Sequence, residues 1–171
     1  MYTIHEDAEK MLKEHSFKLF RHNGLLCCVV RMGFSGVLNG YVAVDKTHQL
    51  YGKNYSDKII MDESPEFNGN YIGLVCCALD PNRKEKEYPL DCALLVHGGL
   101  TYSSDHLSFI DKEVFDNLWW FGFDCSHCDD LKPIQSDIDR EYPIGSQVYR
   151  DFKYVENETR KLAKQLTNIG G

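Results

Sequence analysis

The chain has 171 residues, enough for one domain whose core needs neither disulfides nor a structural metal. Hydrophobic residues make up 43% of it and charged residues 26%, as in soluble globular proteins. Asp and Glu number 26 against 19 Lys and Arg, so the formal net charge is −7. This balance argues against a polymeric nucleic acid as partner, because neutralising phosphates needs a basic surface, but it allows a small nucleotide in a local pocket.

Nothing in the composition predicts export or membrane insertion. The first residues lack the basic and apolar zones of a signal peptide, and each apolar run is interrupted, by Arg31 or by a polar cluster, before it reaches bilayer length. Four of the seven cysteines form the adjacent pairs Cys27-Cys28 and Cys76-Cys77. Neighbours in a strand face opposite sides, so neither pair bridges easily, and reduced buried thiols in a cytoplasmic protein are expected.

The N-terminal quarter predicts a helix followed by a hairpin. Apolar residues at helical spacing favour a helix over 4–15, with Thr3 and Glu6 forming a capping box. Residues 17–20 and 25–32 then read as two strands joined by an Asn-Gly turn.

The rest of the chain predicts more strands and a closing helix. Strands are expected at residues 40–44, 71–79, 92–97 and 119–124, and loops at 33–40, 61–70 and 132–145. An amphipathic helix is expected over 148–166, and one face of it carries Phe152, Val155, Thr159, Leu162 and Leu166. With no repeat or boundary in view, we predict a single α+β domain over 1–171, a mostly antiparallel sheet with N-terminal and C-terminal helices.

A polar segment directly after the aromatic strand is the strongest functional signal. Asp124, His127 and Asp130 recur every third residue, which in a helical turn keeps them near one face. Carboxylate and imidazole groups together suit a divalent metal (Zn, Mn or Mg) and also suit acid–base catalysis at neutral pH. The competing interpretation is a polar turn in which Asp124 caps the following helix and His127 hydrogen-bonds a carbonyl.

His97 is the second candidate, at the end of the apolar run 92–97. The glycines after it, Gly98 and Gly99, would let backbone N–H groups approach a ligand or an anionic intermediate closely. Thr101 and Tyr102 add hydroxyl groups nearby. We expect this strand end and the one at Asp124 to meet in one pocket, although a structural role for His97 is an equal alternative.

Other polar residues could reach the same pocket. His48 and Tyr51 follow the strand at 40–44, where an exposed loop is the competing interpretation. Arg150, near the start of the C-terminal helix, is the best-placed cation for an anionic substrate.

The cysteines near His127 suggest two further chemistries, both weaker. Cys125 and Cys128 have the spacing of a zinc half-site, but no second pair completes a structural zinc site. A nucleobase deaminase would need Glu where Gly99 stands and Pro where Asp124 stands. A cysteine nucleophile is disfavoured because the neighbouring aspartates would raise its pKa.

Four motifs are spread over about three quarters of the chain and leave out the N-terminal helix: Gly40-Tyr41-Val42-Ala43-Val44 with His48 and Tyr51-Gly52-Lys53; Val96-His97-Gly98-Gly99-Leu100-Thr101-Tyr102; Trp119-Trp120-Phe121-Gly122-Phe123-Asp124-Cys125 with His127 and Asp130; and Tyr149-Arg150-Asp151 with Tyr154-Val155. Together they resemble a family of small bacteriophage and prophage proteins. The resemblance implies a phage-borne accessory protein in the host cytosol and supplies no mechanism. Small residues follow the histidine in that family, so Cys128 is doubtful as a family ligand.

These observations favour a metal-assisted hydrolase or phosphodiesterase that acts on a small phosphorylated or nucleotide-like substrate. The phage setting suggests a host defence signal as that substrate. The metal would be held by Asp124, His127 and Asp130, with His97 as a base or further ligand. A pocket that only binds and sequesters a signalling nucleotide is the main alternative, and an interaction protein with structural polar residues is the third. A homo-oligomer is compatible with all three.

Overall fold

The computed structural model describes residues 2–61, 86–111, 113, 115–136 and 147–170. A five-stranded antiparallel sheet forms its centre, with strand order β2-β3-β4-β8-β7. The strands are β2 (Phe17–His22), β3 (Leu25–Arg31), β4 (Leu38–Asp45), β8 (Leu118–Asp124) and β7 (Tyr102–Ser104). The predicted hairpin and the strands predicted at 40–44 and 119–124 are therefore confirmed, as is the α+β class.

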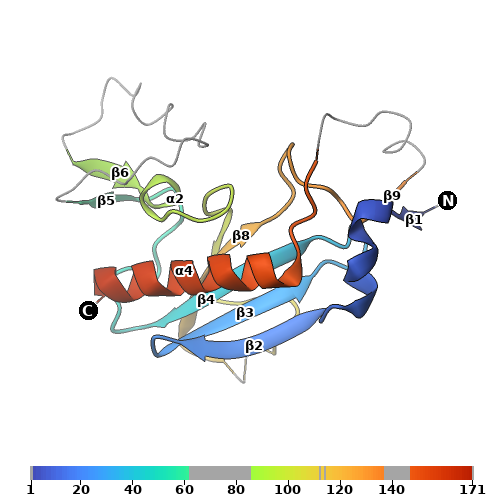
Figure 1. Cartoon of the computed structure of the whole chain (residues 1–171). Helices are drawn as coiled ribbons and strands as arrows, with labels where there is room; N and C mark the ends of the chain where they lie inside the picture. The colour runs from blue at the N-terminus through green and yellow to red at the C-terminus, as the bar shows by residue number, and fades with distance from the viewer. Residues whose placement is uncertain (1, 62–85, 112, 114, 137–146, 171) are drawn as a thin grey trace.

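Helix α4 (Phe152–Gly170) lies across one face of this sheet (Figure 1). The five residues predicted for its apolar face are all buried, and Val155, Leu162 and Leu166 contact the sheet residues of the main core. The helix comes so close at Gly40 that a Cβ there would lie 2.3 Å from Thr159 Oγ1. Packing against the sheet, rather than helix propensity alone, holds α4 in place.

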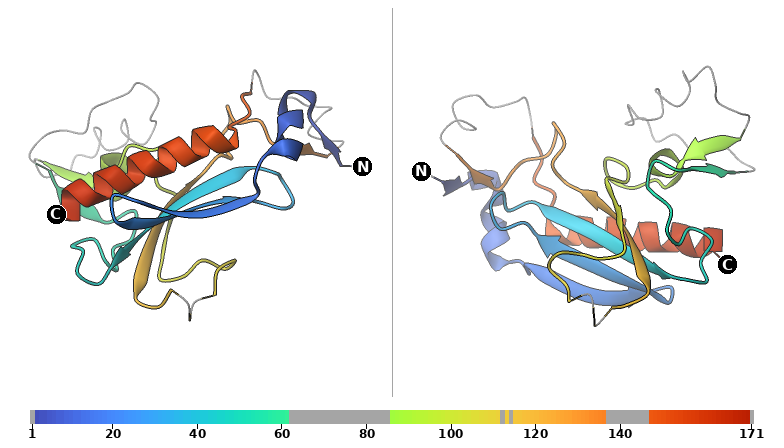
Figure 2. Two further views of the ribbon diagram at one scale, coloured as in Figure 1. Left: turned by 60° about the horizontal axis from the view of Figure 1, so that its bottom comes forward. Right: turned by 180° about the vertical axis from the view of Figure 1, so that it is seen from behind.

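The opposite face of the sheet has its own apolar cluster. Because strand side chains alternate, Cys28 and Tyr41 point away from α4, as does Trp120. Leu107 and the residues around β7 cover this second face (Figure 2). The sheet thus separates two cores, one against α4 and one on the opposite face.

The N-terminal helix differs from the prediction in type and start. It is the 3-10 helix η1 (Glu6–Lys13), and its N-cap is His5, whose Nδ1 accepts a hydrogen bond from the Asp7 N–H. Thr3 cannot be the cap because it belongs to β1 (Thr3–Ile4), which pairs with β9 (Ile134–Gln135). The buried side chains Ala8 and Met11 are three residues apart, a spacing that suits three residues per turn.

The strand predicted at 92–97 is wrong. The short helix α2 (Leu90–Ala93) occupies its start, after β5 (Lys58–Ile60) and β6 (Glu87–Pro89), and an irregular segment follows. That segment is buried, but the backbone N–H and C=O of Leu95 bond the side-chain amide of Gln165 on α4, at 2.8 and 3.0 Å. The backbone N–H and C=O of Leu95 therefore have hydrogen-bond partners without a neighbouring strand.

Several predictions lie outside the described residues: the strand at 71–79, the pair Cys76-Cys77 and most of the loop at 61–70. Within the described part of the chain, all the cysteines are buried except Cys128. No helix among these residues is both long and apolar enough to span a bilayer.

Candidate functional site

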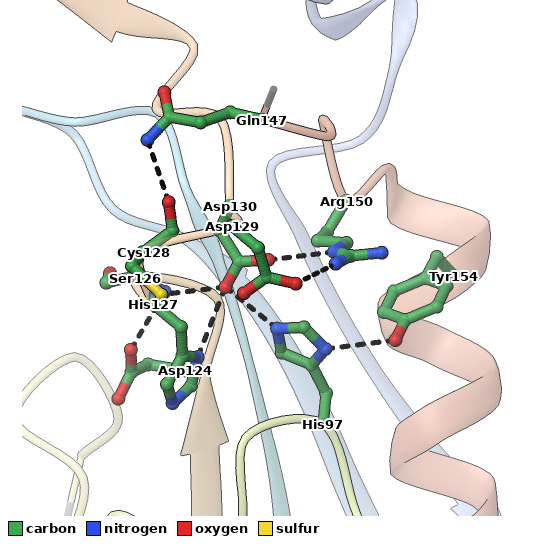
Figure 3. A network of polar contacts seen from close by, with 10 residues as sticks. All are labelled: His97, Asp124, Ser126, His127, Cys128, Asp129, Asp130, Gln147, Arg150 and Tyr154. Carbon is green, nitrogen blue, oxygen red and sulfur yellow. Dashed lines mark hydrogen bonds and ion pairs between the residues drawn. The ribbon is translucent and has the colours of Figure 1, made fainter. Parts of the chain in front are cut away.

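Two segments far apart in sequence meet beside the start of α4. The irregular segment after α2 brings His97, and the turn after β8 brings His127 and Asp130 (Figure 3). Arg150 and Tyr154 approach from the beginning of α4. We refer to these five residues as the Asp130 cluster.

Asp130 is the centre of the cluster, and its side chain is fully buried. Its Oδ2 atom accepts hydrogen bonds from His97 Nε2 at 2.8 Å and from both Nδ1 and the backbone N–H of His127, at 3.1 and 3.0 Å. Its Oδ1 atom accepts from Arg150 Nε at 2.8 Å. Burial alone would raise the pKa of Asp130, but the hydrogen bonds from His127, His97 and Arg150 outweigh it and hold the pKa well below its usual range.

His97 uses both of its ring nitrogens within the protein. While Nε2 donates to the Asp130 carboxylate, Nδ1 lies 3.0 Å from the hydroxyl of Tyr154, which can donate to it. The side chain of His97 is only 8% exposed. Burial raises the pKa of Tyr154 to about 12, so the hydroxyl keeps its proton at neutral pH.

His127 differs from His97 because only one of its ring nitrogens has a partner. Nδ1 faces Asp130, while Nε2 has no hydrogen bond to any described residue, and the side chain is 30% exposed. The hydrogen bond to Asp130 raises the pKa of His127, burial opposes it, and the charge of Asp124 adds to the rise. The structure thus presents one oriented imidazole with an open nitrogen.

Of the glycines after His97, Gly98 leaves room for the ring of His127 and not for a ligand. A Cβ on Gly98, whose φ is +66°, would lie 1.9 Å from Cε1 of His127, so only glycine lets the ring occupy that place. The N–H of Gly99 donates to Val96 C=O in a turn. It is therefore already used, and the oxyanion-binding role predicted for these N–H groups gains no support from Gly99.

Arg150 is bound to two carboxylates. Besides Asp130, it donates through Nη2 to Asp129 Oδ2 at 2.7 Å, and its guanidinium lies 5.3 Å from the ring centre of Tyr154. Burial alone would lower the pKa of Arg150, but its hydrogen bond to Asp130 raises it. The positive charge of Arg150 therefore balances the negative charge of the buried Asp130 carboxylate. An anionic substrate bound by Arg150, as the sequence predicted, would contact a guanidinium that is already ion-paired.

Three residues of the cluster could together hold a metal ion. One ligand atom from each of His97, His127 and Asp130 lies within 4.8 Å of the others. Zinc bonds of about 2.0 Å in tetrahedral geometry would separate ligand atoms by about 3.3 Å, close to the hydrogen-bond distances in the cluster. The sequence pattern predicted Asp124, His127 and Asp130 as the ligands. In the structure the third member of the group is His97 and not Asp124.

Asp124 lies at the edge of the cluster and caps the turn. Its Oδ1 accepts the backbone N–H of Ser126 at 2.9 Å, as a capping residue does, but a turn follows it and not the helix that the capping alternative expected. Asp124 and Ser126 also line a hollow of about 560 Å³.

The remaining predicted binding residues lie elsewhere. His48 Nε2 is 2.9 Å from Leu166 C=O near the end of α4, and Tyr51 packs against Trp119, near the opposite end of β8 from Asp124. A strand of this length puts those two ends about 20 Å apart.

Thr101 and Tyr102 are likewise not part of the cluster. Thr101 N–H donates to Gly122 C=O beside the sheet, and Tyr102 packs edge-on against Tyr41 on the face away from α4. The structure therefore does not bring either hydroxyl to His97.

Tyr154 and Asp129 were missed as site residues by sequence reasoning. For Tyr154, the usable signal is its position four residues after Arg150, a spacing that places two side chains on one side of a helical turn. Asp129 carries no such signal, because its partner Arg150 is 21 residues away and comes close only through the fold.

The cysteines take no visible part in the site. Cys125 is buried, and burial raises the pKa of its thiol, as do the charges of Asp130 and Asp124. A thiolate nucleophile at Cys125 is therefore disfavoured. Among the described residues, the group suited to a metal contains neither Cys125 nor Cys128.

Comparisons with protein-family models, with curated proteins and with solved structures found no match to this chain. The function is therefore inferred from the geometry of the Asp130 cluster.

Proposed function

We propose that the protein is a hydrolase that acts on a small phosphorylated or nucleotide-like substrate at the Asp130 cluster. The observation that carries the proposal is one buried carboxylate oxygen, Asp130 Oδ2, shared by two imidazoles, of which the partly exposed His127 keeps one nitrogen with no hydrogen bond to a described residue. A base held in one tautomer by a third group is the arrangement that recurs in enzymes which activate a nucleophile.

In this mechanism His127 moves the proton. The ionised Asp130 holds the hydrogen on Nδ1, so the lone pair of Nε2 can accept a proton from an attacking water. As the water oxygen bonds to phosphorus, the bond from phosphorus to the leaving oxygen breaks. The leaving oxygen takes its proton from solvent, and His127 releases the proton that it accepted to solvent, which restores the neutral ring.

A divalent metal would use the same atoms in a second way. Two imidazoles and one carboxylate suit zinc better than magnesium, which prefers oxygen ligands. Bound by His97, His127 and Asp130, the metal would supply Lewis-acid activation of water. The protein would supply the burial and the Arg150 hydrogen bond that orient Asp130.

The proposal is tested by phosphodiester hydrolysis and metal analysis of protein purified without a histidine tag. We expect release of 4-nitrophenol from bis(4-nitrophenyl) phosphate, and its loss in His127→Ala. One equivalent of zinc that is lost in His127→Ala would support the metal form, and turnover in metal-free protein would support the proton-transfer form. Hydrolysis that is unchanged in His127→Ala would contradict both.

Saturation of the cluster favours a second candidate function. Both nitrogens of His97 and both oxygens of Asp130 are already bonded within the protein, as in a structural network. The protein would then bind and sequester a signalling nucleotide of the host, with a protonated His127 meeting phosphate. This candidate predicts that nucleotide recovered after denaturation of the complex is chemically intact, whereas a hydrolase predicts cleaved product.

A further inference from the structure

The hollow beside Asp124 has the features of a ligand site distinct from the cluster. Its volume of about 560 Å³ is that of a small-molecule pocket, and aromatic, hydrogen-bonding and cationic residues line it together. Phe34 and Tyr2 provide rings, Asn39 and Asp124 provide polar groups, and Lys132 provides a positive charge. We propose that this hollow binds a nucleoside phosphate whose base carries an exocyclic amino group.

The loop that carries Phe34 is held in one conformation. Met32 N–H donates to Val37 C=O at 2.8 Å, and Ile134 N–H donates to Ser35 C=O at 2.9 Å. Gly36 has a φ of +74° and is packed so closely that a Cβ would lie 2.9 Å from Met11 Sδ. Fixed walls mean that little conformational entropy is lost when a ligand enters.

Phe34 is 78% exposed on this fixed loop, and Tyr2 is 73% exposed. A large ring held in water beside a pocket gains favourable contact area when a flat ligand covers it. Nucleobases have such flat faces and stack on aromatic side chains whatever their sequence identity. The two rings therefore favour a heteroaromatic ligand.

The polar lining indicates which edge of the base is recognised. Asn39 and Asp124 are direct partners in the β4–β8 register, so their side chains are neighbours on one face of the sheet. The Asp124 carboxylate lines the hollow and can only accept hydrogen bonds. A carboxylate acceptor suits a ligand that presents N–H groups, as the amino group of adenine, guanine or cytosine does.

Lys132 determines the charge expected of the ligand. It is exposed and lines the same hollow, which makes it available to an anionic group. Lysine binds phosphate as a point charge, without a fixed fork geometry. A base near Asn39 and a phosphate near Lys132 together describe a nucleotide.

This site deepens the proposed function. It rests on that function in one respect: a nucleotide bound here is the ligand class proposed for the cluster, although none of the five cluster residues lines the hollow and Ser126, which does, only precedes His127 in the chain. Binding to the hollow does not itself require turnover. The two proposals can therefore fail separately.

The test is equilibrium binding measured by calorimetry with defined nucleotides. AMP, GMP and CMP carry the amino group, whereas IMP and UMP lack it and serve as matched controls. We expect at least one of the first three to bind, and IMP to bind about tenfold more weakly than AMP where AMP binds, because Asp124 then loses its donor. Adenosine and inorganic phosphate, tested alone, report the two halves of the site.

Protein variants locate the binding. Phe34→Ala should weaken binding about tenfold through lost stacking, while Phe34→Tyr should keep it. Lys132→Ala should weaken binding of AMP and leave binding of adenosine unchanged. Lys46→Ala, an exposed lysine beyond the other end of β4, is the matched control and should change nothing.

The outcomes separate this inference from the proposed function. Failure of all three amino-bearing nucleotides to bind, or binding that ignores Phe34→Ala and Lys132→Ala, overturns the inference even if the hydrolase is active. Nucleotide binding by a protein that hydrolyses neither these nucleotides nor bis(4-nitrophenyl) phosphate supports the inference and counts against the hydrolase. His127→Ala that binds nucleotide normally but loses turnover supports both.

Discussion

The described residues include two clusters in which a carboxylate, an arginine and a tyrosine are bonded largely away from solvent, and only one of these two has the properties of a reactive site. In the first, Glu14 Oε2 accepts hydrogen bonds from Arg31 Nη2 at 2.9 Å and from the Tyr149 hydroxyl at 2.6 Å. In the second, Asp130 is bonded to Arg150 and to two imidazoles, one of which reaches a tyrosine. The difference between them is histidine.

The Glu14 cluster fastens η1 to β3 and to the segment before α4. Burial raises the pKa of Tyr149, as does its hydrogen bond to Glu14, so the hydroxyl stays protonated at neutral pH. The Tyr149 hydroxyl is therefore not suited to exchange protons near neutral pH. Buried ion pairs alone thus indicate structure, and an oriented imidazole with an open nitrogen is the added feature that indicates chemistry.

The largest effects should come from neutralising the two carboxylates. Asp130→Asn and Glu14→Gln each remove the negative charge that compensates a largely buried arginine. Each should lower the free energy of unfolding by about 3 kcal/mol. Only Asp130→Asn should abolish hydrolysis, because only that change frees the tautomer of His127. Urea unfolding and a turnover assay on both variants measure the contrast.

Asp129→Asn is the matched control for stability. Its carboxylate also bonds Arg150, but the side chain is 60% exposed, so its loss should cost less than about 1 kcal/mol. If folded Glu14→Gln protein lost turnover as completely as Asp130→Asn, the distinction between the two clusters would be mistaken.

The next largest contrast separates the two histidines. His127→Ala should abolish turnover and lower the free energy of unfolding by only about 1 kcal/mol, because the ring is partly exposed and makes one side-chain hydrogen bond. His97→Ala leaves unpaired partners in a buried place and should cost about 2–3 kcal/mol. Unfolding curves and initial rates distinguish these roles.

Rescue of turnover by added imidazole distinguishes a catalytic base from a histidine with a structural role. Added imidazole should restore part of the turnover of His127→Ala, since the vacated place is open to solvent, and none in His97→Ala. Equal rescue of both variants would count against the assignment of His127 as the base.

The sequence predicted the sheet better than the site. Alternating and aromatic runs identified β3, β4 and β8, because a strand's side-chain period is visible locally. The run at 92–97 looked equally strand-like, but its backbone partner is Gln165, 70 residues away.

For the site, the three-residue spacing pointed to His127 and Asp130, and the structure brings these two residues together. It placed Asp124 with them because it assumed a helical turn, whereas the Asp124 carboxylate bonds the backbone of Ser126. That His97 would complete the group depends on a contact across 33 residues, which periodicity does not encode.

A smaller effect is expected from pH, and its sign follows from two groups. The pKa of His127 is raised above 6.5, so turnover that needs its neutral form should rise as pH passes through that higher value. The stability that protonated His127 contributes is full below pH 6.5 and is lost as pH rises through the raised pKa. Asp130 has a lowered pKa, so its contribution is present above pH 3.8 and is lost as pH falls.

Unfolding free energies measured across pH in the wild type and in His127→Ala test this assignment. The loss of stability on the alkaline side should disappear in the variant, while the loss on the acid side remains. A variant that keeps the alkaline loss would place its origin outside His127.

The smallest effect is expected at the far end of β8, where His48 was also a predicted binding residue. Its Nε2 bonds Leu166 C=O near the C-terminus of α4, and its Nδ1 accepts the N–H of Leu50, so it joins a turn to the helix end. His48→Ala should lower the free energy of unfolding by about 1 kcal/mol and leave hydrolysis unchanged. Thermal unfolding and initial rates over a range of substrate concentrations measure both. A raised KM in His48→Ala with an unchanged melting temperature would show that substrate reaches this end, about 20 Å along the strand from Asp124.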